Sequence, residues 1–169
     1  MPDIPKYARL EIERRWLADL GAVGALEGRP YREVHDLYIA GTRLRLRKIS
    51  GPAGEAAFKL GKKYGKRGAF FEPVTNLYLS EREYQALSSL PGARIHKRRY
   101  ALSGGSLDVY LGPLDGLAIF EIELGDEGSA QAYQPPGFVL REITHDADFT
   151  GAALASRGAA PPSGDGGVR

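Results

Sequence analysis

Polar and apolar residues alternate with a period of two along several short stretches of the chain. Residues 42–47 place three arginines on one side and two leucines on the other, and residues 120–124 alternate three apolar residues with two glutamates. Successive side chains of a β-strand point to opposite faces, so this period is typical of a strand. Each stretch therefore predicts a strand with one charged face and one apolar face.

The same pattern along the chain predicts a protein built mostly of short strands. Turn signals such as Ala40-Gly41-Thr42 separate them, and their close spacing favours antiparallel pairing. Residues 16–20 predict a short turn or helix, and residues 62–68 predict an exposed basic connection. The strands that we expect span residues 8–15, 33–39, 43–49, 56–60, 69–79, 94–101, 106–111, 117–124 and 138–144.

Three helices are predicted from their N-terminal capping residues. Ser80 and Glu83 have the spacing of a capping box, which indicates a helix to about residue 90. Ser129 is expected to cap a brief helix through Tyr133, and Asp146 a final helix through about residue 155. Together with the strands, these helices indicate an α+β protein.

Charged residues recur on one face of many of these strands. Repulsion between like charges costs stability unless opposite charges, solvent or a bound ion compensate. A single such strand is typical of a solvated outer face, but rows of both signs on at least seven strands favour a closed barrel with a charged interior and apolar outer faces beneath helices. The residues in these rows are Glu11, Glu13, Arg15, Arg43, Arg45, Arg47, Lys59, Lys97, Arg99, Asp108, Glu121, Glu123 and Glu142.

The types of charged residue indicate what such an interior can bind. Carboxylate oxygens suit Mg²⁺ or Mn²⁺, whereas clustered arginine and lysine suit phosphate oxygens, which arginine can bind in a bidentate fashion. A metal combined with cationic side chains is the general equipment for phosphoryl transfer. The rows therefore predict a site for a metal-bound polyanion.

Composition narrows the possibilities further. The chain has 169 residues, of which 43% are apolar, enough for one domain with a core. We expect that domain to span residues 1–156, followed by a disordered tail over residues 157–169. The absence of cysteine excludes disulfides and thiolate metal sites, and three scattered histidines leave little for imidazole chemistry.

Charge and hydropathy address the partners and the location of the protein. The net charge of +2 does not favour general nucleic-acid binding. No stretch approaches 18 uninterrupted apolar residues and the N-terminus lacks a secretory profile, so we expect a cytoplasmic protein without a membrane partner. The oligomeric state stays open, a homodimer included.

The histidines carry no predicted chemistry. His35, His96 and His145 each adjoin a charged residue, but neighbouring residues on a strand face opposite sides, so a structural or exposed histidine is expected at each position. The basic run over residues 61–66 lacks the spacing of a phosphate-binding loop.

Residues 11–15, Glu-Ile-Glu-Arg-Arg, resemble the ExExK signature of the triphosphate tunnel metalloenzymes, also called the CYTH superfamily. The similarity continues in order over about residues 7–155, which is most of the chain. The further segments that carry it are residues 44–47, 58–60, 95–100, 107–110, 120–123 and 141–146.

The resemblance implies an eight-stranded antiparallel tunnel that binds a triphosphate-containing small molecule with Mg²⁺ or Mn²⁺ and hydrolyses it. Short bacterial members are often inorganic triphosphatases, so inorganic triphosphate, cleaved to diphosphate and phosphate, is the expected substrate. Catalysis is then assigned to Glu11, Glu13 and Arg15. The implied metal ligands are Glu11, Glu13, Asp108, Glu121 and Glu123, and the implied phosphate ligands are Arg45, Arg47, Lys59, Lys97 and Arg99.

The chain departs from the signature at one position. Arg15 stands where the family has lysine, and an arginine cannot act as a general base. A non-catalytic module that binds triphosphate or polyphosphate is therefore one alternative, and a class IV-type adenylate cyclase is another. The strand register also leaves Lys59, Lys62 or Lys63 as the inward lysine, of which we favour Lys59.

Overall fold

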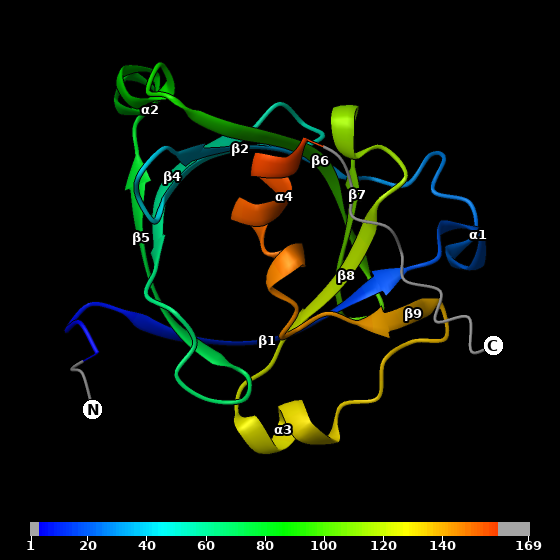
Figure 1. The fold of residues 1–169 in the computed structure, drawn as a ribbon. Coiled ribbons are helices and arrows are strands. Elements are labelled where there is room, and N and C mark those ends of the chain that lie inside the picture. Colours follow the sequence, from blue (N-terminus) through cyan, green and yellow to red (C-terminus); the bar gives the residue numbers. More distant parts are fainter. Residues whose placement is uncertain (1–3, 159–169) are drawn as a thin grey trace.

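The computed structural model describes residues 4–158, and within them one sheet of nine strands forms most of the fold (Figure 1). Because side chains alternate along a strand, the charged residues of each predicted row lie on one face of their strand and the apolar residues between them lie on the other. The strands are β1 (Arg9–Ala18), β2 (Arg32–Ile39), β3 (Leu44–Ser50), β4 (Ala56–Lys63), β5 (Phe71–Leu79), β6 (Gly92–Leu102), β7 (Gly105–Tyr110), β8 (Ala118–Glu123) and β9 (Val139–Glu142).

The sheet closes into a barrel because β1 pairs with β8 on one side and with β5, the first strand in the order, on the other. Hydrogen bonds connect the strands in the order β5, β4, β3, β2, β6, β7, β8 and β1, and the first half of β1 then pairs with β5, where Arg9 lies opposite Val74. Every one of these pairings is antiparallel. The predicted eight-stranded barrel is confirmed, with β9 as an additional strand along the second half of β1.

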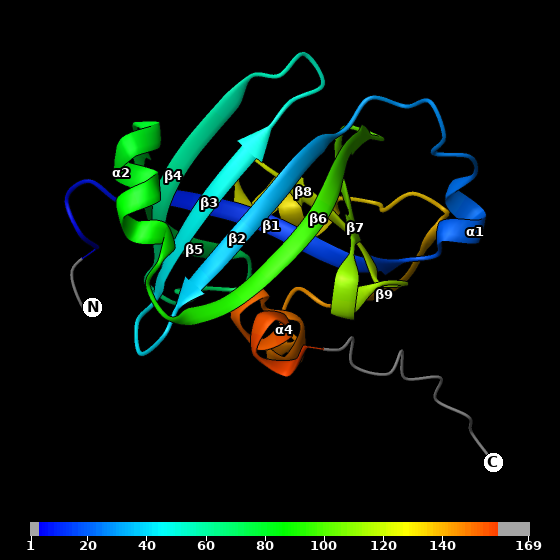
Figure 2. The same cartoon turned by 90° about the horizontal axis from the view of Figure 1, so that it is seen from above.

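Helix α2 (Glu81–Ser88) covers the outside of the barrel against β3, β4 and β5 (Figure 2). Its capping box is present as predicted, with Ser80 accepting the backbone N–H of Glu83 and the Glu83 side chain accepting that of Ser80. Beneath the helix, Leu37 and Leu46 belong to a buried apolar cluster. The leucines of β3 therefore face the helix, which leaves its arginines to face the interior.

The C-terminal segment closes one end of the barrel. The short helix η2 (Ala147–Phe149) and α4 (Gly151–Arg157) lie across this end, as Figures 1 and 2 show. Phe149 and Leu154 pack there in one buried cluster with Tyr110 and Ile119 from the barrel wall. The interior is consequently apolar at the closed end and charged farther along the axis.

Another apolar cluster lies on the outside, where Trp16 and Phe120 of β1 and β8 are buried beneath Tyr133 and Phe138. The segment between β8 and β9 supplies this cover, and it includes helix α3. The remaining short helical elements are α1 (Leu20–Val23), η1 (Gly112–Leu114) and α3 itself (Glu127–Ala132).

Two strands extend beyond their predicted ends. Residues 16–18 continue β1 instead of forming a turn or helix, because Leu17 pairs with both Ile119 of β8 and Arg141 of β9. Residues 62 and 63 continue β4 instead of belonging to an exposed loop, because they pair with Thr75 and Val74 of β5. The second correction matters for the site, since it turns Lys63 inward.

The structure also moves two helix caps from their predicted positions. Asp126, not Ser129, caps α3, and its carboxylate accepts the Ser129 N–H at 2.7 Å. The predicted final helix is divided in two, so that Asp146 caps η2 while Thr150 caps α4. In each case a second short polar residue lies about one turn from the predicted cap and can itself accept a backbone N–H. The sequence pattern alone does not distinguish between the two.

The predicted tail falls almost wholly outside the described residues, which end at residue 158; within them, Arg157 belongs to α4. Across residues 4–158, no helix combines the length and the apolar character needed to span a lipid bilayer.

Candidate active site

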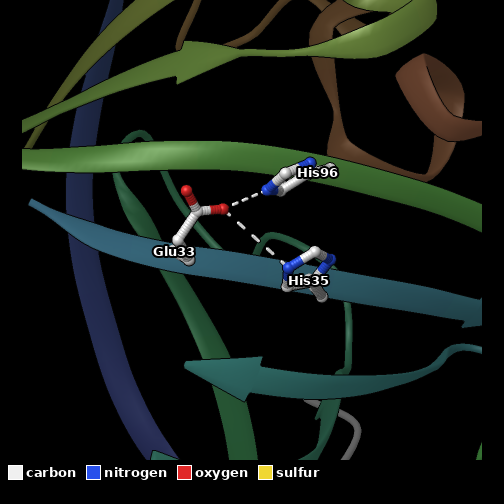
Figure 3. Close-up of side chains that lie close together, drawn as sticks. All are labelled: Glu33, His35 and His96. Atoms are coloured by element: carbon white, nitrogen blue, oxygen red, sulfur yellow. Dashed lines mark hydrogen bonds and ion pairs between the residues drawn. The ribbon is translucent and has the colours of Figure 1, made fainter. Parts of the chain in front are cut away.

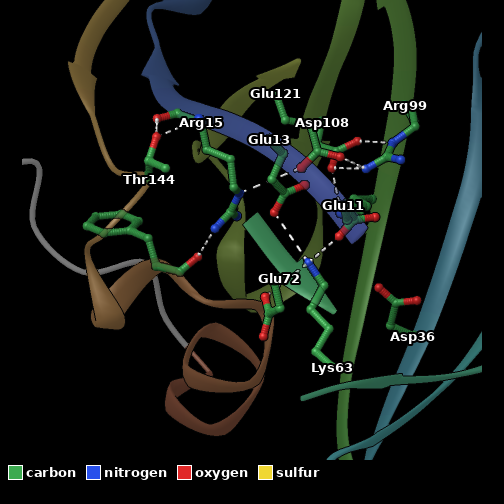
Figure 4. A network of polar contacts seen from close by, with 12 residues as sticks. Glu11, Glu13, Arg15, Asp36, Lys63, Glu72, Arg99, Asp108, Glu121 and Thr144 are labelled. Atoms are coloured by element: carbon green, nitrogen blue, oxygen red, sulfur yellow. Dashed lines mark hydrogen bonds and ion pairs between the residues drawn. The ribbon is translucent and has the colours of Figure 1, made fainter. Parts of the chain in front are cut away.

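The inner face of β1 carries Glu11, Glu13 and Arg15 in a row, as the period of two predicts (Figure 4). Strand pairing brings further acids beside them: Glu72 of β5 lies opposite Glu11, and Glu121 of β8 lies opposite Arg15. Same-face neighbours across antiparallel strands lie close enough to interact. The acidic residues of three strands therefore meet along one wall of the barrel.

Three of these carboxylates converge on a single ammonium group. The Nζ atom of Lys63 lies 2.7 Å from Glu11 Oε2, 3.3 Å from Glu13 Oε1 and 3.7 Å from Glu72 Oε2. Burial lowers the pKa of Lys63, but Glu13 and Glu11 outweigh that effect and raise it above its usual value. The lysine is thus held charged, and it neutralises only one of three carboxylates. We call Glu11, Glu13, Glu72 and Lys63 the glutamate group.

Lys63 is the one cation of the glutamate group itself; the guanidinium of Arg9 lies 3.8 Å from Glu11 Oε1 but is 61% exposed, so it compensates little of the buried charge. Burial raises the pKa of Glu13, Lys63 opposes this effect, and the neighbouring charges of Glu121 and Glu11 add to it. The Oε2 atom of Glu11 is buried and forms no hydrogen bond of good geometry, although Lys63 lies within ion-pair distance. Buried carboxylate oxygens without full compensation are costly, so this group favours an additional cation.

On the opposite side of the interior, Asp108 organises two cations. Its carboxylate is fully buried, accepts a bidentate pair of hydrogen bonds from Arg99 at 2.6 and 2.7 Å, and also contacts Lys97. Burial alone would raise the pKa of Asp108, but Lys97 and Arg99 hold it well below its usual range. Arg99 reaches Glu121 as well. Both oxygens of Asp108 are therefore occupied by Arg99 and Lys97.

Asp36 of β2 likewise holds a buried cation, Arg47 of β3, by hydrogen bonds. The pair is bidentate, with distances of 2.6 and 2.7 Å, and both side chains are buried. Burial works against the charge on Asp36, yet Arg47 lowers its pKa below the usual value. We call Asp36, Arg47, Lys97, Arg99 and Asp108 the aspartate group.

Arg45 and Lys59 face the interior without an acidic partner among the described residues. They share the inner face because β3 pairs with β4, with Arg47 opposite Lys59 and Arg45 opposite Gly61. The Nε atom of Arg45 is buried and has no hydrogen-bond partner. Lys59 places its ammonium 4.9 Å from the ring centre of Tyr78. A buried guanidinium donor with no acceptor favours a bound anion.

Arg15 lies between the charged interior and the closed end. Its guanidinium donates to the carbonyl of Phe149 at 3.0 Å, and its Nε lies 3.7 Å from Glu121. Its backbone N–H donates to the Thr144 hydroxyl. Burial opposes its charge, but Tyr110 and Glu121 outweigh the burial and raise its pKa. Arg15 therefore stays a cation and cannot accept a proton.

Most of the residues predicted for the site are brought together. Glu123 shares the inner face but lies at the exposed rim, where it pairs with Arg9 at 2.8 Å. Glu142 is excluded from the interior, because it pairs with Arg14 on the outer side of β1. Lys59 and Lys63 both face inward, whereas Lys62 is exposed, and of these lysines it is Lys63 that meets the carboxylates.

The sequence did not point to Asp36 and Glu72, and it left Lys63 as an alternative to the favoured Lys59. Two of these residues have a detectable signal, since Asp36 is two residues from Val34 on a predicted strand and Lys63 is an even number of residues from Lys59. Pro73 and the glycines around Lys63 interrupt the expected strand patterns. Only the register of β4 against β5 reveals that both Glu72 and Lys63 turn inward.

The fold and these groups define a class of protein, namely closed antiparallel barrels whose interior sets acidic against basic side chains. No family model matches the chain. The inorganic triphosphatase of Nitrosomonas europaea is 30% identical to it over 152 residues, which make up 86% of this chain and 96% of that protein. The chain therefore belongs to the triphosphate tunnel metalloenzyme, or CYTH, superfamily, with the bacterial inorganic triphosphatases.

Two solved structures share the fold at 24% identity. The hypothetical protein NE1496 aligns with a TM-score of 0.55 over 89% of this chain and 99% of that chain. The inorganic triphosphatase NE1496 aligns with a TM-score of 0.53 over 86% of this chain and 93% of that chain. At this level of identity the alignments support the barrel fold alone.

Proposed function

We propose that this protein hydrolyses a triphosphate, with inorganic triphosphate as the preferred substrate and diphosphate and phosphate as products. The observation that supports the proposal is that one barrel contains both a carboxylate group short of positive charge and an arginine short of a hydrogen-bond acceptor. The glutamate group has more negative charge than its lysine can balance, and Arg45 has a buried donor without an acceptor. A triphosphate bound with a divalent cation supplies both missing charges.

The cationic side chains are assigned to the phosphates. Arg45 and Lys59 are available directly, since no carboxylate holds them among the described residues. Arg47, Lys97 and Arg99 are held by Asp36 and Asp108, which fixes their heads before substrate binds. Preorganised cations of this kind stabilise the charge that spreads over the transferred phosphoryl group.

The glutamate group is assigned to the metal. Carboxylate oxygens from Glu11, Glu13 and Glu72 converge within reach of one point, and hard oxygen ligands are those that Mg²⁺ and Mn²⁺ prefer. Glu121 is adjacent, whereas Glu123 lies at the rim and Asp108 is already occupied by cations. A bound metal would supply charge neutralisation of the phosphates and a lower pKa for water.

Arg15 remains charged and cannot take the proton of the attacking water, so we assign that proton to a carboxylate of the site that does not hold the metal. Arg15 is assigned as a permanent positive charge beside Glu121, near the closed end of the barrel. The arginine is then compatible with turnover.

The test compares release of phosphate with binding. The purified full chain is incubated with inorganic triphosphate, ATP or thiamine triphosphate, each with Mg²⁺ or Mn²⁺, while calorimetry measures binding of the same compounds. We expect turnover that requires the metal and is fastest with inorganic triphosphate.

Binding without release in both this protein and its Arg15→Lys variant would contradict the proposal in favour of a non-catalytic module. Release that appears only in Arg15→Lys would lead to the same conclusion and would identify the cause. Formation of cyclic AMP from ATP would instead support a cyclase.

A further inference from the structure

A cluster of Glu33, His35 and His96 lies on the outer face of the barrel, away from the charged interior (Figure 3). One ligand atom from each residue lies within 4.8 Å of the other two. All three side chains are partly exposed, by 29%, 48% and 39% respectively, so an ion from solvent can reach them. Their residue types differ from those of the glutamate group, which contains no histidine.

Strand register assembles the cluster on a rigid support. His35 of β2 lies directly opposite His96 of β6, and Glu33 is two residues before His35 on the same face. The two imidazole rings stack with centroids 4.1 Å apart and an angle of 16° between their planes. Because the backbones are held in the closed barrel, the three side chains stay near one another without a ligand.

Both histidines direct the same ring nitrogen at one carboxylate oxygen. Nε2 of His35 lies 3.9 Å from Glu33 Oε2, and Nε2 of His96 is in direct contact with that oxygen. The other oxygen of Glu33 accepts a hydrogen bond from Arg98 Nε at 3.2 Å. Arg98 is in turn stacked over the ring of Tyr31. An outer partner of this kind orients a ligating carboxylate toward its metal.

The surrounding charges permit a cation despite two basic neighbours. Lys48 of β3 lies opposite His35, and Arg98 lies opposite Glu33. Arg98 is already compensated by Glu33, and the Lys48 ammonium lies 6.0 Å from the ring centre of Phe58.

We propose that Glu33, His35 and His96 form a second metal site, which binds a divalent transition metal of the Zn²⁺ class. Two imidazoles and one carboxylate are the ligand set of many zinc sites with an open position. The same set discriminates against Mg²⁺, which prefers oxygen ligands and octahedral geometry. The site is therefore distinct in chemistry and in place from the glutamate group.

The open coordination positions have room for a further ligand. His35 and His96 also line a cavity of about 340 Å³ between the barrel, η1 and α4. Zinc binds imidazole nitrogen at about 2.0–2.1 Å, so the stacked rings must turn their Nε2 atoms toward each other around the metal. The rings are partly exposed, so rotation about their side-chain bonds is the movement that metal binding requires of them.

The test is a Zn²⁺ titration of the full chain, followed by calorimetry and by NMR of the three histidine rings. We expect the resonances of His35 and His96 to shift together at one equivalent, while those of His145 stay unchanged. His96→Gln and Glu33→Gln should each weaken this binding step by about 100-fold or more, since loss of a direct ligand exceeds the 10- to 100-fold effect of outer partners.

Two controls separate this site from the interior. His145→Gln removes an exposed histidine and should leave the titration unchanged, and a Glu11→Gln, Glu13→Gln double variant should keep the histidine shifts even where it loses Mg²⁺ binding. Equal shifts of all three histidines, or Zn²⁺ affinity unaffected by His96→Gln in a folded variant, would overturn the proposal. Neither outcome depends on hydrolytic activity, so the proposed triphosphatase can fail while this site stands.

Discussion

The glutamate group and the aspartate group occupy two sides of one barrel, yet they handle buried charge in opposite ways. In the aspartate group, Asp36 and Asp108 each meet their cations in bidentate pairs of 2.6 to 2.7 Å. In the glutamate group, three carboxylates share the single ammonium of Lys63 at 2.7 to 3.7 Å. In the first arrangement each carboxylate has a bidentate arginine of its own, and in the second no carboxylate does.

This contrast separates a structural task from a binding task. A balanced and buried bidentate pair holds its members in place and leaves little gain for an added ion. An unbalanced group gains from an added cation and so is suited to binding one. We therefore expect changes of Asp36 and Asp108 to act mainly on folding, and changes in the glutamate group to act mainly on metal binding.

The largest effect is expected from Asp108→Asn. The change leaves Lys97 and Arg99 without their shared partner inside the barrel, and breaking a buried pair in this way costs about 3–5 kcal/mol. Urea unfolding measures the free energy, and Asp115→Asn, at an exposed position, serves as the control. A loss of under about 1 kcal/mol would break the comparison, because Asp108 would then not be structural.

The next effect is the loss of activity in Glu11→Gln. An uncharged amide keeps the shape but removes a charged oxygen ligand, so we expect metal-dependent turnover to fall about 100-fold, or about 2.7 kcal/mol of activation free energy. The unfolding midpoint should change little. Glu81→Gln, an exposed position at the start of α2, is the matched control, and equal turnover in both variants would remove Glu11 from the metal site.

Arg45→Ala should affect substrate affinity more than stability. No acid among residues 4–158 pairs with this side chain, so its removal leaves no buried carboxylate without a partner and costs the fold little. Loss of one phosphate contact should raise KM for triphosphate about tenfold, or about 1.4 kcal/mol. Steady-state kinetics measure this, with the exposed Arg82→Ala as control. An unchanged KM would mean that the unpartnered guanidinium does not bind phosphate.

Lys63→Met sharpens the comparison within the glutamate group itself. Removal of the shared ammonium should lower stability without metal by about 1 kcal/mol, a value kept small because the side chain is 41% exposed. Added Mg²⁺ or Mn²⁺ should then stabilise the variant more than the unchanged protein. Lys62→Met, on the outer face of the same strand, should show neither effect, and an absence of metal rescue in Lys63→Met would indicate that the carboxylates do not converge on a cation.

The smallest effect is expected from a fall in pH, which should change the free energy of unfolding in opposite directions through the two groups. Glu13 has a raised pKa in the fold, so its destabilising charge is relieved as pH falls toward about 4.3, its unfolded value. Asp36 has a lowered pKa, so its stabilisation is present above about 3.9 and is lost as pH falls below that value. Stability measured from pH 7 to 2 should rise slightly and then decline. A Glu13→Gln variant should lack the rise, and a steady decline that starts at pH 7 would contradict the assignment.

The sequence permits prediction of the barrel because the required signal is local. Alternation of Leu44 and Leu46 with the arginines of β3 specifies both the strand and the face that each residue occupies. The ordered resemblance to the triphosphate tunnel superfamily identified Glu11, Glu13 and the five cations of the site. The capping box at Ser80 likewise needs only four neighbouring residues.

Other features could not be predicted because they depend on strand pairing. The convergence of Glu72 with Glu11, and of both with Lys63, follows from the closure of β1 on β5 and the register of β4. The same holds for His35, whose partner His96 lies 61 residues farther along the chain on another strand. No chemistry was predicted for either histidine, because the charged residue that adjoins each of them faces the other side of its strand.

The amino-acid sequence by itself determined which faces are charged, because side-chain direction in a strand depends only on the parity of position. The tertiary structure alone decided which charges meet, which remain unbalanced and which end of the barrel is closed by Phe149 and Leu154. The physical reason is that electrostatic compensation depends on distances of a few ångströms between residues far apart in sequence, and only the closed sheet sets those distances.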